Sequence, residues 1–517
     1  MMAARAAFYR RQRLRTALSG ARAGDLLALL AGVALAFAFA PWGLWPLAII
    51  APAVLFLLWQ DCSRRRAAWR GWVFGVGLWG TGVYWIYHSL HLFGAAIAPL
   101  AGALTVGFIL LLALIPAALG ALVVGRDAER RGALWFLLVL PGAWVLVEWV
   151  RSWLFTGFPW LLLGTSQIDS WLAGYAPVFG VYGMSLAVAL TAGALAYTWR
   201  GCWRGRALAL SVAVVIWGTG AVLSGVHWSR SGGQPFDAAL IQGDIEQEQK
   251  FETQEKALNR YENLTRVAAD EAELVLWPET AVPTFYRRVA DRLNNFGKEM
   301  EAEGAHIVTG VFTLDTETRR YYNAVRPLGF NRMAYHKQRL VPFGEYMPLR
   351  GYLEFLERYI QIPMSDIAPG VPDQAPLEVG NIRLGASVCY EAAYPGVMRR
   401  MAVRADVLVN VSNDGWFGDS TAPHQHLQIA RLRARETARP MLRATNTGIT
   451  AIINHRGEIV SRGPQFEVTV VEARIDPRAG LTPYVQMGDI PAIGGAALLA
   501  FLPYLIGTLR RRRVDGT

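Results

Sequence analysis

The sequence predicts a multi-pass α-helical membrane bundle joined to one extracytoplasmic α/β domain. Apolar runs recur through the first 230 residues, the composition becomes mixed and charged after Ser231, and one more apolar run follows near the C-terminus. Within the charged region, strand patterns alternate with helical ones, which is typical of an α/β domain. The chain has 517 residues, of which 53% are hydrophobic, and this length allows two or more domains.

Eight apolar runs in the sequence are long enough to span a bilayer, which takes about 17–25 residues per span. They cover residues 24–41, 44–60, 71–92, 95–124, 133–149, 171–198, 206–228 and 490–509. A cleaved signal peptide is the competing interpretation of the first run. No small-residue cleavage site precedes Pro41, so we expect this span to be retained.

The net charge of +11 at pH 7 is concentrated in short arginine clusters between the apolar runs. These clusters precede the first run and follow the second, fourth, sixth and eighth, so they all lie on one side of a membrane. By the positive-inside rule this side is the cytoplasm, where both termini are expected. The α/β domain then lies outside, and the charge distribution does not favour a nucleic-acid partner.

These features divide the chain into five segments. They are a basic cytoplasmic N-terminus at 1–23, seven transmembrane helices in 24–230, the external domain at 231–488, an eighth transmembrane helix at 489–509 and a basic cytoplasmic tail at 510–517.

Within the external domain, apolar alternation predicts the strands. They are expected at Asp237–Gln242, Glu273–Trp277, His306–Phe312, Tyr321–Leu328, Ile382–Cys389, Asp406–Val411, Gly448–Asn454 and Val468–Ile475. Helical patterns cover Leu258–Val267, Thr284–Glu303 and His424–Arg439. Periodicity does not decide between a single sheet and a two-sheet sandwich.

Three strand ends carry reactive side chains. Glu279 follows the apolar run ELVLW, Lys337 lies in AYHKQR, and Cys389 ends RLGASVC. α/β folds place their reactive groups at such strand ends. Each residue alone has a simpler interpretation, as a solvated turn glutamate, a surface lysine and an inert cysteine. Cys389 is the one cysteine of three in the external domain, so it is either buried and inert or a working thiol.

The three residues in their contexts, WPETA, HKQRLVPFGE and CYE, resemble the Glu-Lys-Cys triad of the nitrilase, or carbon–nitrogen hydrolase, superfamily. With the eight apolar runs and the segments TGFPWL, VSNDGWFG, QHLQIARLRARE and RATNTGIT, the chain is similar to the membrane-embedded lipoprotein N-acyltransferases of Gram-negative cell envelopes. The resemblance implies an α-β-β-α sandwich with Glu279, Lys337 and Cys389 as its catalytic residues.

The same resemblance implies further site residues. Glu345, Tyr390 and Glu391 match positions that bind substrate or support the triad, and Trp416 and Phe417 match a mobile, lipid-facing loop. Phe251 stands where these enzymes commonly have a tryptophan, so an aromatic contact is expected there without a role specific to tryptophan. Whether Glu345 and Glu391 orient Lys337 or bind an incoming amine is left open.

The implied reaction is an acyl transfer in two halves. Cys389 attacks an ester carbonyl of a phospholipid, expected to be the sn-1 acyl of phosphatidylethanolamine, and forms a thioester. The α-amino group of a lipoprotein's N-terminal S-diacylglyceryl cysteine then attacks the thioester, in ping-pong fashion. Glu279 acts as general base, and Lys337 with the Tyr390 N–H stabilises the oxyanion. No cofactor is required, and a monomer in the inner membrane is expected.

Other interpretations remain beside this one. A membrane-anchored nitrilase-type amidase would use the same triad, although an anchor needs one span. A catalytically dead lipid-binding or transport protein would have no use for the trio. The aromatic segment Arg151–Ser170 is either an interfacial or re-entrant element supporting an acyl chain or an ordinary aromatic belt. His424 and His426 diverge on a predicted helix, so no metal site is predicted.

Overall fold

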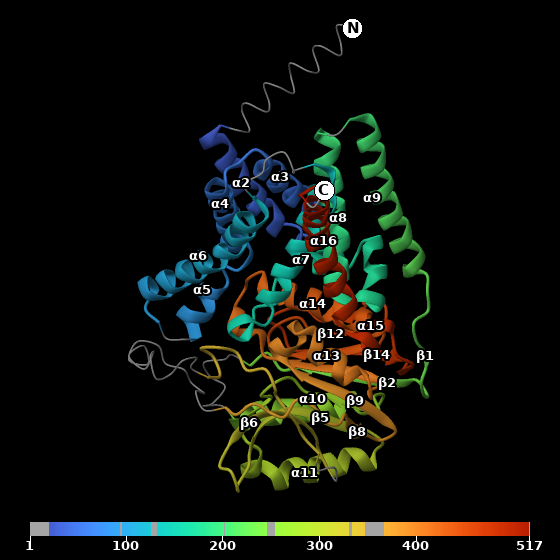
Figure 1. The fold of residues 1–517 in the computed structure, drawn as a ribbon. Coiled ribbons are helices and arrows are strands. Elements are labelled where there is room, and N and C mark those ends of the chain that lie inside the picture. The colour runs from blue at the N-terminus through green and yellow to red at the C-terminus, as the bar shows by residue number, and fades with distance from the viewer. Residues whose placement is uncertain are drawn as a thin grey trace.

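The computed structural model describes residues 20–93, 96–125, 132–200, 202–245, 254–329, 333–346 and 367–515. Figure 1 shows a bundle of helices stacked on a part that is built from strands and shorter helices. The last helix, α16 (Ile490–Asp515), returns the chain from the strands to the bundle. The chain therefore runs from the helices through the strands and back to a helix.

Every predicted apolar run coincides with helical structure in the bundle. The long helices are α2 (Ala21–Ala36), α3 (Leu47–Gln60), α4 (Arg64–Gly82), α6 (Ala98–Val123), α7 (Leu140–Arg151), α8 (Ala176–Arg200) and α9 (Trp203–Ser224), together with α16. Between them lie α5 (Ile86–His88), η1 (Ser89–Phe93), η3 (Trp135–Val139), η4 (Leu154–Thr156), η5 (Leu163–Gln167) and η6 (Trp171–Tyr175). Within the described residues, three helical stretches are long and apolar enough to cross a bilayer, at Ala98–Val123, Trp171–Trp199 and Trp203–Ser224. The count of eight spans stays a prediction.

The α/β domain contains two main sheets. One has the order β14 (Thr469–Ile475), β2 (Phe236–Gln242), β3 (Leu274–Leu276), β5 (His306–Leu314), β6 (Tyr321–Pro327) and β7 (Tyr335–His336), with β4 (Val282–Phe285) paired to β5. The other has the order β13 (Ile459–Arg462), β12 (Ala451–Ile453), β11 (Met441–Thr445), β10 (Val407–Ser412), β9 (Ile382–Val388) and β8 (Leu377–Val379). A small ribbon joins β1 (Arg230–Ser231) to β15 (Arg478–Ala479).

Helices cover both sheets and complete the implied α-β-β-α sandwich. They are α10 (Gln254–Ala268) and α11 (Tyr286–Ala302) on one side, and α13 (Pro395–Ala402) and α14 (Ala422–Thr437) on the other, while α15 (Pro483–Met487) packs against α8, α13 and α14. The side chains of β2 alternate between two hydrophobic cores, one on each face of its sheet. Ala239 and Ile241 join the core beneath α10 and α11, whereas Ala238 and Leu240 join the core that contains the second sheet.

The helix α14 connects the sandwich to the bundle, and most of its 16 residues are buried. On its bundle-facing side, Gln425 donates to the Gly82 carbonyl over 3.1 Å, and Glu436 accepts from the Val181 N–H over 2.7 Å. Arg431 forms an ion pair with Asp169. The sandwich therefore packs on the bundle through polar as well as apolar contacts.

The strand predictions are confirmed for the long strands and incomplete elsewhere. Each predicted strand overlaps an observed one, although the stretch predicted from Gly448 begins pairing only at Ala451. The strands β4, β7, β8, β11 and β13, and the two-residue strands β1 and β15, were not predicted. Of these, β11 is a fully buried inner strand that carries Arg443, and its polar side chains conceal the alternation expected of a strand.

Candidate active site

The three predicted catalytic residues converge between the two sheets. Glu279 follows β3, Lys337 follows β7, and Cys389 follows β9. All three side chains are buried, with exposed fractions of 6% for Glu279, 1% for Lys337 and 7% for Cys389. The Lys337 Nζ lies 3.7 Å from the Glu279 Oε1. The thiol lies close enough to interact electrostatically with both of the other groups.

Glu279 is held by two donors, one on each oxygen. Its Oε1 accepts from the Asn323 Nδ2 over 2.7 Å, and its Oε2 accepts from the Asn413 backbone N–H over 2.8 Å. Asn323 lies within β6, and Asn413 directly follows β10. The carboxylate is therefore fixed by both sheets, as a base with a defined direction of proton transfer requires.

Lys337 is fixed by Glu345, which the sequence placed among the supporting residues. The Lys337 Nζ donates to the Glu345 Oε1 over 2.9 Å. Glu345 is itself fixed, because it accepts from the Asn323 Nδ2 over 3.1 Å and from the Val341 N–H over 2.8 Å. Burial alone would lower the pKa of Lys337, but Glu345 and Glu279 outweigh it and raise this pKa. The ammonium is therefore charged, and Glu345 orients it.

Cys389 sits at the first position of a short 3-10 helix, η8 (Cys389–Ala393), directly after β9. Its φ is 51°, in the left-handed region that residues other than glycine seldom adopt. Burial and the nearby Glu279 raise the pKa of the thiol, while Lys337 lowers it less strongly. The resting thiol is therefore protonated, and its reaction requires a base to take the proton.

Glu391 ties the lysine segment to the cysteine strand. Its Oε1 accepts from the N–H groups of Gln338 and Arg339 over 2.6 and 3.1 Å, and its Oε2 accepts from the Val388 N–H over 2.8 Å. The Tyr335 hydroxyl donates to the same carboxylate. Burial raises the pKa of Glu391 to about 6, against these N–H bonds. Four donors and complete burial hold this carboxylate in place, which favours a positioning role for Glu391 over binding of an amine.

Replacing Glu391 by glutamine is expected to destabilise the protein by about 2 kcal/mol, because an amide nitrogen cannot accept from the Val388 or Gln338 N–H. A lower thermal unfolding midpoint in detergent is the measurement. Glu472→Gln is the matched control, since Glu472 is exposed on β14. An unchanged midpoint in Glu391→Gln would contradict the positioning role.

The predicted loop residues Trp416 and Phe417 contact the helical bundle. The Ser89 hydroxyl donates to the Trp416 carbonyl over 2.8 Å, and the Phe417 ring packs edge-on against Trp85 with centroids 4.9 Å apart. Both residues lie in η9 (Asp414–Phe417). The predicted residue Phe251 lies outside the described residues.

Tyr390 connects the triad to the aromatic segment after α7. Its ring stacks on the fully buried Trp160, with centroids 6.1 Å apart. The Tyr394 hydroxyl donates to the carbonyls of Thr156 and Gly157, each over 3.1 Å. In the same segment Phe155 is 91% exposed. Thr156, Gly157 and Trp160 thus pack beside the candidate active site, while the neighbouring Phe155 presents an exposed apolar side chain.

A set of buried polar residues beneath Cys389 was given no individual role by the sequence. It comprises Asn410, Asp414, His426 and Arg443, each at most 1% exposed. The motifs VSNDGWFG, QHLQIARLRARE and RATNTGIT contain or adjoin these residues and were the available signal. The Nε2 of His426 lies 3.0 Å from the Cys389 carbonyl oxygen, so this ring nitrogen has a protein partner.

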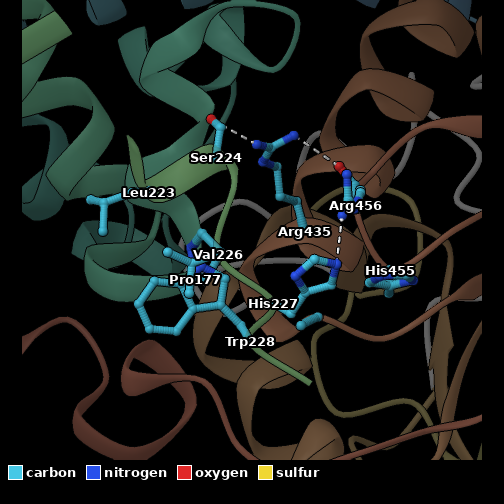
Figure 2. A pocket seen from close by; sticks show the side chains of 10 residues that line it. Pro177, Leu223, Ser224, Val226, His227, Trp228, Arg435, His455 and Arg456 are labelled. Atoms are coloured by element: carbon cyan, nitrogen blue, oxygen red, sulfur yellow. Dashed lines mark hydrogen bonds between the residues drawn. The ribbon is translucent and has the colours of Figure 1, made fainter. Parts of the chain in front are cut away.

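A small cavity of about 30 Å³ lies where the end of α9 meets α14 (Figure 2). Arg435 donates to the Ser224 hydroxyl and to the Arg456 carbonyl, each over 3.1 Å. Arg456 in turn lies 3.1 Å from the His227 Nε2. None of the triad lines this cavity, and its guanidinium groups are engaged, so it is a junction between bundle and sandwich and not the active site.

Comparison with known proteins identifies the family. Residues 31–194 match the apolipoprotein N-acyltransferase N-terminal domain, and residues 237–484 match the carbon–nitrogen hydrolase domain. An apolipoprotein N-acyltransferase of Methylococcus capsulatus is 42% identical over 498 residues, which cover 94% of this chain and 96% of that protein. One from Azotobacter vinelandii is 41% identical, covering 95% and 96%. A solved carbon–nitrogen hydrolase superfamily protein of Xanthomonas campestris has 18% identity and a TM-score of 0.36, over 47% of this chain and 91% of that chain. The chain therefore belongs to the apolipoprotein N-acyltransferase family, the acyltransferases built on the carbon–nitrogen hydrolase fold.

Proposed function

We propose that this enzyme transfers an acyl chain from a phospholipid, through a thioester on Cys389, to the α-amino group of the N-terminal S-diacylglyceryl cysteine of lipoproteins. The observation that carries the proposal is the meeting of a buried thiol, a charged lysine and a doubly anchored carboxylate at Cys389, Lys337 and Glu279. The family membership supports lipoproteins as the acceptors.

In the first half-reaction, Glu279 takes the proton of the Cys389 thiol, and the sulfur attacks the ester carbonyl carbon. The negative charge that develops on the carbonyl oxygen is stabilised by Lys337 and by the N–H of Tyr390. The carbon–oxygen bond then breaks, Glu279 returns its proton to the departing alkoxide, and a lysophospholipid leaves. Covalent catalysis thereby divides one difficult transfer into two easier steps.

In the second half-reaction, the lipoprotein α-amine attacks the thioester carbonyl carbon. Glu279 takes a proton from the amine, and the same two donors stabilise the oxyanion. The carbon–sulfur bond breaks, an amide forms, and the proton on Glu279 passes to the Cys389 sulfur. Thiol and carboxylate are thus restored.

The bundle supports access to lipid substrates. In this proposal the chain crosses the inner membrane eight times, with residues 24–230 and 489–509 as spans, both termini in the cytoplasm and residues 231–488 in the periplasm. The exposed Phe155, beside the segment that touches Tyr390 and Tyr394, favours an interfacial role for residues 151–170. Trp416 and Phe417 act as the lipid-facing element in this arrangement.

Incubating purified enzyme with phosphatidylethanolamine is expected to add the mass of one acyl chain to Cys389. Intact-protein mass spectrometry measures this gain, and Cys389→Ser is the matched control because it removes the thiol. Adding a diacylglyceryl peptide with a free N-terminus is expected to remove the added mass faster than water does. Equal discharge by water would favour an amidase-type hydrolase, and no adduct with any phospholipid would overturn the thioester mechanism.

A further inference from the structure

The carbonyl oxygen of Cys389 receives two side-chain hydrogen bonds from the sandwich interior. His426 Nε2, on α14, lies 3.0 Å from this oxygen, and Asn410 Nδ2, on β10, lies 3.2 Å from it. Both side chains are completely buried. The His426 ring also packs against Trp160 and Phe417, with centroid separations of 5.7 and 6.3 Å, which keeps this oxygen away from bulk solvent.

One guanidinium group determines the orientation of both donors. Arg443 donates through Nη1 to the Asn410 Oδ1, and its Nη2 lies 3.0 Å from the His426 Nδ1. Arginine nitrogens only donate, so Nδ1 of a neutral imidazole must accept here and Nε2 must carry the proton. By the same reasoning, the Asn410 amide must direct its NH₂ toward Cys389. Burial and Arg443 lower the pKa of His426, which agrees with a neutral ring.

The guanidinium is itself anchored by Asp414. The Arg443 Nη2 donates to the Asp414 Oδ2 over 2.7 Å, and the Ser412 hydroxyl donates to the Asp414 Oδ1 over 2.7 Å. The Asp414 Oδ1 also lies 3.1 Å from the His426 Nδ1. All of these groups lie in the interior, where a partly satisfied network would be costly.

The fixed carbonyl determines where the next N–H points. The carbonyl of Cys389 and the N–H of Tyr390 belong to one planar, trans peptide unit, so they point in opposite directions. Tyr390 lies in the first turn of η8, where N–H groups have no acceptor within the helix. Because Cys389 has a φ of 51°, a conformation that is unfavourable for this residue, the peptide needs support from outside its own backbone. Donors on the carbonyl also polarise the amide and strengthen its N–H as a donor.

We propose that His426 and Asn410 are positioning residues for acyl transfer, which fix the Cys389–Tyr390 peptide so that the Tyr390 N–H faces the developing oxyanion. Arg443 and Asp414 set their orientation. The inference rests on the proposed thioester mechanism. That mechanism uses the N–H of Tyr390, and the inference assigns a function to the Cys389 carbonyl of the same peptide.

The test compares two reactions of the same thiol in full-length enzyme. Acylation of Cys389 by phosphatidylethanolamine passes through an oxyanion, whereas alkylation by iodoacetamide does not. His426→Leu and Asn410→Asp each remove one donor, and aspartate at 410 still accepts from Arg443, so that variant retains the interior contact. We expect single-turnover acylation to slow by about 10²–10³-fold in each variant. The rate of alkylation is expected to change less than about threefold at every pH measured.

His426→Gln, whose amide can donate again, is expected to recover part of the acylation rate, and His424→Gln on the same helix is the matched control. Equal losses in acylation and alkylation would assign these residues to fold maintenance, and unchanged acylation in Asn410→Asp would overturn the proposal. If wild-type enzyme alkylates but never acylates, the thioester mechanism itself fails. That result is distinct from a loss confined to the variants.

Discussion

Replacing Lys337 by methionine is expected to slow acylation of Cys389 by about 10²–10³-fold, as for removal of one oxyanion donor. Methionine nearly preserves the length and packing of the side chain but removes the charge. The ammonium lies 2.9 Å from Glu345 and 3.7 Å from Glu279, so its removal also leaves two carboxylates facing one another across Asn323. The thiol then loses the positive group that lowers its pKa.

Single-turnover mass spectrometry with phosphatidylethanolamine measures this loss, and iodoacetamide alkylation measured in parallel is expected to slow as well. This double effect separates Lys337 from His426, for which only acylation is expected to change. Lys256→Met is the control, since Lys256 is exposed on α10. Acylation at the wild-type rate in Lys337→Met would exclude the lysine from the chemistry.

Replacing Arg443 by methionine is expected to cost about 3–5 kcal/mol of unfolding free energy, the range for breaking one partner out of a buried ion pair. Arg443 and Asp414 are both completely buried and lie 2.7 Å apart. Without the guanidinium, Asp414 is left in the interior with the Ser412 hydroxyl as a hydrogen-bond donor and, among the described residues, no positive group to balance its charge. The expected observation is a large drop in the thermal unfolding midpoint of detergent-solubilised enzyme.

Two comparisons make this prediction specific. Arg266→Met breaks the ion pair with Glu299 and is expected to cost at most about 1 kcal/mol, because both side chains of this pair are about half exposed.

The pH dependence of the unfolding free energy provides the second comparison. Arg443 and the hydrogen bond from Ser412 outweigh burial and lower the pKa of Asp414, so the folded state gains stability from the ionised form above the unfolded pKa of about 3.9 and loses it as the pH falls further. In Arg443→Met the guanidinium no longer opposes burial, which raises the pKa of Asp414, so the carboxyl takes up a proton and the deficit should shrink as the pH is lowered from neutral toward 4. A deficit that does not vary with pH would show that packing, and not charge, is responsible.

The sequence places Glu279, Lys337 and Cys389 after apolar runs, and the sandwich brings these three positions together. Each residue alone had a simpler interpretation, and the joint pattern in its sequence contexts was the signal. Glu391 was also found, but its role was not, since periodicity does not reveal that four donors converge on its carboxylate. Only the folded chain distinguishes a positioning carboxylate from one that binds substrate.

The residues beneath Cys389 were harder to predict for a physical reason. Arg443 lies in β11, where an arginine contradicts the apolar pattern of a buried strand, and it is tolerated because Asn410 and Asp414 accept from it. His426 was considered only as a metal ligand, because its spacing from His424 was the available signal. A contact between residues 389 and 426 depends on how α14 packs across the sheet, and no local pattern encodes that packing.

The burial of α14 on both faces determines whether the sandwich can be separated from the helical bundle. Two separate family domains match the sequence, at 31–194 and 237–484, yet the helix that supplies His426 to one of them is held by Gly82 and Val181 of the other. A catalytic half cut free at residue 231 would expose the bundle-facing side of α14 to water and lose those bonds. Secretion of that half as a soluble protein, or its attachment to another membrane anchor, is therefore expected to disturb the contact between His426 and the Cys389 carbonyl. The two family domains are distinct in sequence, but the contacts of α14 require them to fold against one another.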